Sequence, residues 1–166
     1  MPEKKTTARA KRAKREGKSP STQAGAYVHE EIEHIREGKH GAKSTKQAIA
    51  IGLSKARRAG VKVGTPKKAS ASTRRKARQD SAQGEQGTAA GKKTSATRSR
   101  ATKRALKKAP TRAASSTALS RHAKSAAKKR TASSRSAAAK KAARTKGAAG
   151  RSAAAKKAAR TRKRAA

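Results

Sequence analysis

The sequence contains no cysteine, tryptophan or phenylalanine, and its single aromatic residue is Tyr27. Without cysteine the chain forms neither disulfides nor thiolate metal sites, which suits a reducing, cytoplasmic environment. Large apolar residues are also few, because most of the apolar content is alanine, and the longest apolar run extends only from Ala48 to Leu53. A membrane-spanning helix needs roughly 20 apolar residues, so no membrane partner is expected.

The N-terminus has charge but no apolar segment, so it does not resemble a secretory signal. Its acid-poor, arginine-containing composition leaves an organellar transit peptide as an alternative.

Acidic residues are scarce. The chain has 8 Asp and Glu against 48 Lys and Arg, a formal net charge of +40 on 166 residues. Such an excess favours a polyanionic partner, and nucleic acid is the most abundant one in a cell. Residues 86–166 hold 26 basic residues and no acid. We therefore divide the chain into a basic arm (1–26), a helical hairpin (27–63), a linker (64–85) and a histone-like tail (86–166).

Nine of the twelve large apolar residues lie between Tyr27 and Val63. Their spacing of i, i+4 and i+7 predicts one helix over residues 24–37, ended by Gly38, and a second over residues 45–59. Ser44 and Gln47 form a Ser-x-x-Gln capping box at the start of the second helix. The expected apolar face of this hairpin consists of Val28, Ile32, Ile35, Ile49 and Leu53.

Outside the hairpin, large side chains are too few to offset a conformational entropy cost of about 1–2 kcal/mol per ordered residue. The expected fold class is therefore a mostly disordered chain with one small all-α hairpin and basic tails that become helical on binding. The hairpin itself has a marginal core, so we expect it to form a homodimer or to dock on nucleic acid.

The tail is low in complexity, and the string RSAAAKKAART occurs in it twice, at residues 135–145 and 151–161. On a helix, the clustered cations of each copy share one face and repel one another until phosphates neutralise them. The cations expected to contact nucleic acid are Lys11, Arg12, Lys14, Arg15, Lys67, Lys68, Arg74, Arg75, Lys103, Arg104, Lys107, Lys108, Lys128, Lys129, Arg130, Lys140, Lys141, Arg144, Lys156, Lys157, Arg160, Arg162, Lys163 and Arg164.

The stretch HEEIEH, residues 29–34, invites comparison with the zinc-protease motif H-E-x-x-H. That motif needs its histidines four apart on one helix face, whereas His29 and His34 are five apart. No third ligand is evident, so these residues are expected to form solvated pairs, Glu30 with His34, His29 with Glu33, and Glu33 with Arg36. The sequence predicts no catalytic residue, metal, cofactor or small-molecule substrate, and we expect no enzyme.

Two stretches resemble known families. The segment KHGAKSTKQAIAIGLSKARRAG, Lys39–Gly60, resembles the KHG…S-x-KQAIAIxLSxAR signature of a family of small basic bacterial proteins of uncharacterised function. Residues 86–166 are similar to the Lys- and Ala-rich tails of bacterial linker-histone-like proteins, which coat and compact DNA. Thr65-Pro66-Lys67-Lys68 resembles the Ser/Thr-Pro-Lys-Lys elements of linker-histone tails, although a plain linker turn explains it equally well.

The leading hypothesis is sequence-independent DNA binding and compaction by a nucleoid-associated protein. No recognition helix and no stacking aromatic platform stands out, so phosphate contact and minor-groove insertion remain. In one alternative, the hairpin is a protein-interaction or plasmid- and chromosome-maintenance adaptor that the tails tether to DNA. In another, the partner is RNA or the ribosome.

Overall fold

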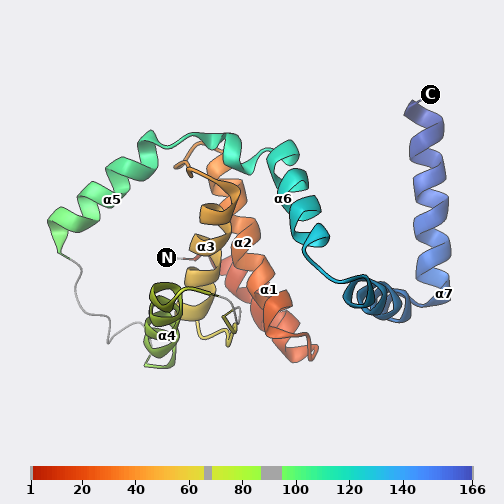
Figure 1. Cartoon of the computed structure of the whole chain (residues 1–166), viewed down its shortest axis with the longest axis horizontal. Helices are drawn as coiled ribbons and strands as arrows, with labels where there is room; N and C mark the ends of the chain where they lie inside the picture. Colours follow the sequence, from red (N-terminus) through yellow and green to blue (C-terminus); the bar gives the residue numbers. More distant parts are fainter. Residues whose placement is uncertain (1, 66–68, 87–94, 166) are drawn as a thin grey trace. The chain divides into compact units, whose positions relative to one another are not determined.

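The computed structural model is all-α, and it describes residues 2–65, 69–86 and 95–165. Its elements are α1 (Lys4–Arg15), α2 (Pro20–Arg36), α3 (Thr45–Arg58), α4 (Ala71–Glu85), α5 (Ala96–Lys108), the short 3₁₀ helix η2 (Thr111–Ala114), α6 (Ser116–Lys128) and α7 (Ala132–Ala165) (Figure 1). The described ranges hold no strand, which confirms the all-α class. None of these helices is long and apolar enough to cross a membrane. Two compact units, residues 1–122 and 123–166, are considered separately.

The expectation of a mostly disordered chain is wrong. In the first unit α1 packs on α2, α4 packs on α3, and η2 packs on both helices of the hairpin. The reason lies in the alanines, which bury little surface individually but together form most of the core. One core cluster consists of Ala10, Ala24, Ala26, Tyr27, Ala56 and Val61, and a second of Ile35, Ala42, Ala48, Ala113 and Ala114. Small side chains let helix backbones approach closely, so packing is dense despite few large residues.

The predicted hairpin is present as α2 and α3. α2 starts at Pro20, four residues before its expected start, because Ser19 occupies the N-cap position and proline suits the first turn. It ends at Arg36, one residue before the predicted end. The predicted stop, Gly38, has a φ of 73°, a left-handed conformation that glycine adopts without strain. Lys39 N donates to His34 O over 2.9 Å and closes this C-terminal turn.

The predicted capping box at α3 is confirmed in its first half. The Ser44 hydroxyl accepts a hydrogen bond from Gln47 N at 3.2 Å. A capping box has the Gln47 side chain accept from Ser44 N. In the structure Gln47 Oε1 instead accepts from the preceding backbone amide, Lys43 N, at 2.8 Å. Both bonds satisfy backbone donors that a helix start otherwise leaves unpaired.

The expected apolar face of the hairpin is largely used inside the chain. Ile35 is fully buried in the second core cluster with Ile32 packed beside it, and Leu53 packs against the first cluster. Val28 and Ile49 are half-buried. α1, α4 and η2 of the same chain pack against the two helices of the hairpin.

α1 and α4 bury small residues at helical spacing. In α1 the buried positions are Thr6 and Ala10, one turn apart, and in α4 they are Ala77 and Asp80. Each helix thereby covers a hairpin helix with one narrow face and leaves the opposite face to solvent.

A segment of the expected tail docks on the hairpin. Gly41 N donates to Leu106 O at 2.8 Å, and the Thr45 hydroxyl donates to Ala113 O at 2.8 Å. The Arg36 guanidinium donates to Ala114 O at 2.9 Å. These bonds satisfy carbonyl groups around η2 and hold it against the loop between α2 and α3.

In the second unit, α7 changes direction at Gly147, whose φ of 64° interrupts the helix (Figure 1). One copy of the RSAAAKKAART repeat lies before this kink, at residues 135–145, and the other after it, at residues 151–161. The glycine therefore separates two similar basic helical segments, because only glycine adopts this backbone conformation readily.

Candidate nucleic-acid interface

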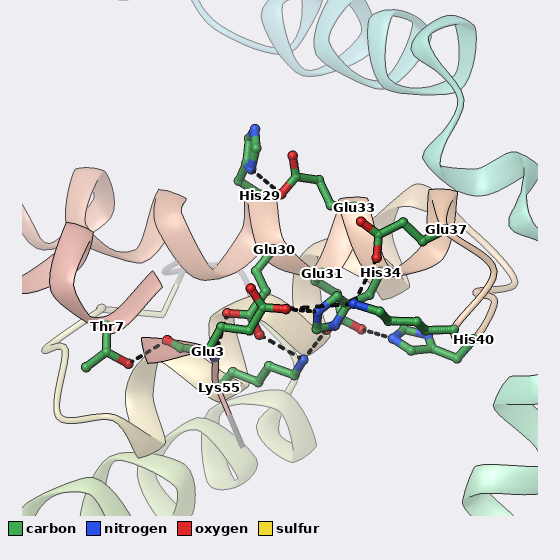
Figure 2. A network of polar contacts seen from close by, with 11 residues as sticks. Glu3, Thr7, His29, Glu30, Glu31, Glu33, His34, Glu37, His40 and Lys55 are labelled. Atoms are coloured by element: carbon green, nitrogen blue, oxygen red, sulfur yellow. Dashed lines mark hydrogen bonds and ion pairs between the residues drawn. The ribbon is translucent and has the colours of Figure 1, made fainter. Parts of the chain in front are cut away.

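The buried carboxylates of the first unit are engaged in internal ion pairs. Glu30 and Glu31 on α2 are 3% and 0% exposed. Lys55 of α3 places its Nζ 2.6 Å from Glu31 Oε2 and 3.7 Å from Glu30 Oε1, and Glu3 N donates to Glu30 at 3.2 Å (Figure 2). These contacts tie α2 to α3 and to the residue that precedes α1. Because such pairs are internal, these carboxylates do not neutralise the outward cations.

Asp80 has the same role between α3 and α4. It is 1% exposed and accepts a hydrogen bond from the Ser54 hydroxyl at 2.6 Å. Lys76 Nζ and Arg58 Nε lie 3.3 and 3.6 Å from its other oxygen. This carboxylate therefore anchors α4 on α3 and holds two of the cations that surround it.

The pairs predicted around HEEIEH have mixed outcomes. His29 Nδ1 lies 3.1 Å from Glu33 Oε2, as expected. The expected solvated pair of Glu30 with His34 is wrong, because Glu30 is buried against Lys55 while His34 Nε2 lies 2.9 Å from Glu3 Oε1. Glu3 comes from a segment 31 residues away, so local helix spacing could not indicate this partner.

The basic residues predicted to contact phosphates lie at the surface wherever their side chains are described. Twenty of the 24 are described, and all twenty are exposed. They are Lys11, Arg12, Lys14 and Arg15 on α1; Arg74 and Arg75 on α4; Lys103, Arg104, Lys107 and Lys108 on α5; Lys128, Lys129 and Arg130 at and after the end of α6; and Lys140, Lys141, Arg144, Lys156, Lys157, Arg160 and Arg162 on α7. Lys67 and Lys68 lie outside the described residues, and the side chains of Lys163 and Arg164 are also outside the description.

The structure distributes these cations over several helices instead of gathering them into one pocket. On α1 all four are exposed, whereas Thr6 and Ala10 of the same helix are buried. On α5 and α6 no residue is buried, so the basic side chains are open to solvent around each helix. The arrangement is an extended set of basic surfaces, which suits a long polyanion better than a compact ligand.

Each repeat on α7 carries several cations, and its sequence contains no acidic residue. Lys140 and Arg144 are spaced i, i+4, and so are Lys156 and Arg160. Like charges at this spacing cost a helix about 0.2–0.5 kcal/mol per pair. Since no acidic residue occurs after Glu85, no carboxylate of the tail can relieve this repulsion.

Two pKa shifts follow from the local environments of the first unit. The Lys18 and Arg12 side chains beside Glu16 lower the pKa of that carboxyl. Burial raises the pKa of the Tyr27 phenol above 10.0, because ionisation would place a charge in the alanine-lined core.

Sequence reasoning missed one group of side chains. Glu31, His34 and His40 converge near the C-terminal end of α2, with potential ligand atoms within 4.8 Å of one another. The signal present in the sequence is Glu-x-x-His on one helix turn, followed by a histidine just beyond the glycine that ends the helix. The comparison with H-E-x-x-H drew attention to His29, which Figure 2 shows paired with Glu33 away from this group.

Residues 21–69 match a family of unknown function (DUF6496). The match includes the resemblance noted for Lys39–Gly60 and covers less than half of the chain, leaving α1, α4 and the whole tail outside it. No curated protein and no solved structure matches the chain. These comparisons assign no activity to the hairpin and do not bear on the likeness of residues 86–166 to linker-histone-like tails.

Proposed function

We propose that this protein binds DNA without regard to base sequence and compacts it in the manner of a nucleoid-associated, histone-like protein. The observation that carries the proposal is the separation of charge. The buried carboxylates pair inside the first unit, whereas the described basic side chains predicted to contact phosphates all lie at the surface. Residues 86–166 add 26 basic residues and no acid.

Binding would occur through phosphate neutralisation. Each Lys or Arg that contacts a phosphate releases condensed counterions, so log K falls with log salt by about 0.9 per contact on duplex DNA. Phosphate contacts carry no sequence information, and the chain has no second aromatic residue to build a base-stacking platform. Affinity should therefore depend on salt and duplex length and only weakly on base sequence.

Compaction would follow from the presence of cations on both units. Residues 1–122 carry exposed basic side chains on α1, α4 and α5, and residues 123–166 carry them on α7. Two linked basic units in one chain can contact different duplexes or distant parts of the same one, and linkage raises the effective concentration for the second contact.

The test is a fluorescence-anisotropy titration of the full chain against unrelated duplexes of equal length at several salt concentrations. Six cations of α7 are replaced with glutamine: Lys140, Lys141, Arg144, Lys156, Lys157 and Arg160. If all six contact phosphates, the slope of log K against log salt should fall by about 5. Glutamine keeps the helix propensity of these positions, so loss of binding would reflect loss of charge.

The matched control exchanges Lys and Arg at the same six positions, which keeps every charge and should leave the slope within about one contact. An affinity that is independent of salt would contradict the proposal. A large preference for one duplex would replace it with specific recognition. Preferential binding of RNA of equal length would assign the basic surfaces to RNA.

A further inference from the structure

Three side chains of metal-binding type meet near the end of α2. Glu31 and His34 are spaced i, i+3 on α2, and His40 belongs to the loop that follows Gly38. Each offers one potential ligand atom, and the three atoms lie within 4.8 Å of one another. The imidazole rings of His34 and His40 are inclined at 85° with centroids 6.4 Å apart. Figure 2 shows Glu31 between α2 and the loop, with His40 beside it.

The contact between Glu31 and His40 has the spacing of two ligands of one ion. His40 Nδ1 is 3.2 Å from Gly41 O, an acceptor that keeps a proton on this nitrogen and leaves Nε2 to face the carboxylate. His40 Nε2 lies 3.1 Å from Glu31 Oε1, yet neither Glu31 oxygen has a well-aligned hydrogen bond from any residue that the structure describes. Ligand atoms of a tetrahedral zinc ion, each about 2.0–2.1 Å from the metal, are about 3.3 Å apart.

The Glu31 carboxylate is fully buried, so neighbouring groups must balance its charge. Glu31 is 0% exposed, and a carboxylate in that position needs cationic partners. Lys55 supplies one at Oε2, whereas Oε1 faces the imidazole of His40. The side chains of His34 and His40 remain 15% and 19% exposed, so the site has a path from solvent. A buried anionic oxygen beside two accessible imidazoles matches the donor set of borderline divalent ions such as Zn²⁺.

A further carboxylate supports His34 from outside the group. Glu3 Oε1 lies 2.9 Å from His34 Nε2. If His34 binds the metal through its other nitrogen, Glu3 is the acceptor that orients the ring, as carboxylates do for many metal-bound histidines. If Glu3 itself binds the ion, it completes a four-coordinate site. Both arrangements require Glu3 for tight binding.

The charges around these three side chains favour the binding of a cation. Four carboxylates, those of Glu3, Glu30, Glu31 and Glu37, face two ammonium groups, those of Lys39 and Lys55. With neutral imidazoles this group of side chains has a net charge of −2. Lys55 occupies Glu31 Oε2 at 2.6 Å, so Oε1 is the oxygen available to a metal.

We propose that Glu31, His34 and His40 form a binding site for one Zn²⁺ ion. The ion would join α2 to the loop before α3 and, through Glu3, to the start of α1. A structural metal adds free energy of folding where a small core adds little, and the neighbouring core cluster is made largely of alanine. The site shares no residue with the basic side chains proposed to contact DNA, so DNA binding by those side chains and zinc binding by this group can succeed or fail independently.

The test is isothermal titration of the chelator-treated full chain with ZnCl₂, together with the visible absorption spectrum of the Co²⁺ form. We expect one ion per chain, a rise in melting temperature on zinc addition, and the intense absorption bands of four-coordinate cobalt. His40→Gln and His34→Gln should each weaken Zn²⁺ binding by more than about 100-fold, and Glu3→Gln by about 10–100-fold.

The chain supplies two matched controls. His29 pairs with Glu33, and His122 lies outside the cluster, so His29→Gln and His122→Gln should leave stoichiometry, affinity and the cobalt spectrum unchanged. Circular dichroism of each metal-free variant tests whether it is folded. No Zn²⁺ binding by the unmodified chain, or equal loss in a control variant and in His40→Gln, would overturn the proposal. An octahedral, weakly absorbing cobalt spectrum would overturn it even if a ligand variant fails to fold.

Discussion

The close approach of α2 and α3 at Gly52 leads to a stability prediction with a defined sign. A Cβ atom added at Gly52 would lie 2.7 Å from Val28 Cα and 3.0 Å from Val28 N. Non-bonded carbon atoms prefer about 3.5–4.0 Å, and both neighbouring atoms belong to the backbone of α2. Rotating a side chain cannot relieve this overlap, so the two helices must move apart.

Two effects of Gly52→Ala oppose each other. Alanine in a helix interior is better than glycine by about 1 kcal/mol. Overpacking a tight contact costs about 1–3 kcal/mol, and the upper part of this range applies because backbone atoms are involved. We therefore expect a net loss of about 1–2 kcal/mol in the free energy of unfolding.

Gly25 provides the matched control on α2. It is exposed, and a Cβ added there meets nothing within 4 Å. Gly25→Ala should accordingly raise the free energy of unfolding by about 0.5–1 kcal/mol through helix propensity alone. Because the two substitutions should change the free energy of unfolding in opposite directions, comparing them separates the effect of packing from the effect of helix propensity.

Urea unfolding measured by the fluorescence of Tyr27 is the appropriate assay. Tyr27 is the single aromatic residue, is 1% exposed, and lies in the core cluster that also contains Ala56 of α3. Its signal therefore reports on the first unit without a contribution from α7. If Gly52→Ala stabilises the chain as much as Gly25→Ala does, the close contact between α2 and α3 is refuted.

Three further predictions concern other parts of the first unit. Burial raises the pKa of the Tyr27 phenol, so the neutral phenol stabilises the fold fully below the unfolded pKa of 10.0, and this stabilisation is lost as pH rises through the folded pKa. Tyr27→Phe should therefore flatten the decline of melting temperature with pH in alkaline buffers. An unchanged decline would contradict this prediction. Ser44→Ala removes the hydroxyl that caps α3 and should cost about 1 kcal/mol in urea unfolding, a value near zero being the adverse result. Asp80→Ala should cost about 1–3 kcal/mol because it leaves the partly buried Ser54 hydroxyl and two cations without their acceptor. Exposed Glu85→Ala on the same helix should change stability by less than about 0.5 kcal/mol.

The docking of η2 shows that a segment assigned to the tail by its position in the sequence packs on the hairpin in the structure. Gly41 contacts Ala109 and Pro110 so closely that a Cβ at Gly41 would overlap their backbone carbonyl groups. The residues that make this contact belong to the sequence region assigned to the tail. Residues 106–115 contain the single proline of the tail, Pro110, and one of its two leucines, Leu106. Neither residue indicates on which part of the chain this segment docks, because that contact depends on residues about 70 positions away.

Local signals were sufficient for the hairpin. The stop at Gly38 and the cap at Ser44 depend on backbone conformation and on bonds between residues a few positions apart, so a single sequence reveals them. The excess of cations is likewise a property of composition, and the absence of acid after Glu85 leaves these cations without a carboxylate in their own part of the chain.

Only the tertiary structure determined how weakly apolar helices form a core and which distant groups meet. Ala10 and Ala56 bury little surface individually, and their value depends on the close approach of the helices that carry them. His34 meets Glu3 across 31 positions, and His40 reaches Glu31 from the loop because the chain turns back there. Such contacts depend on the arrangement of whole helices, which leaves no periodic pattern in the sequence.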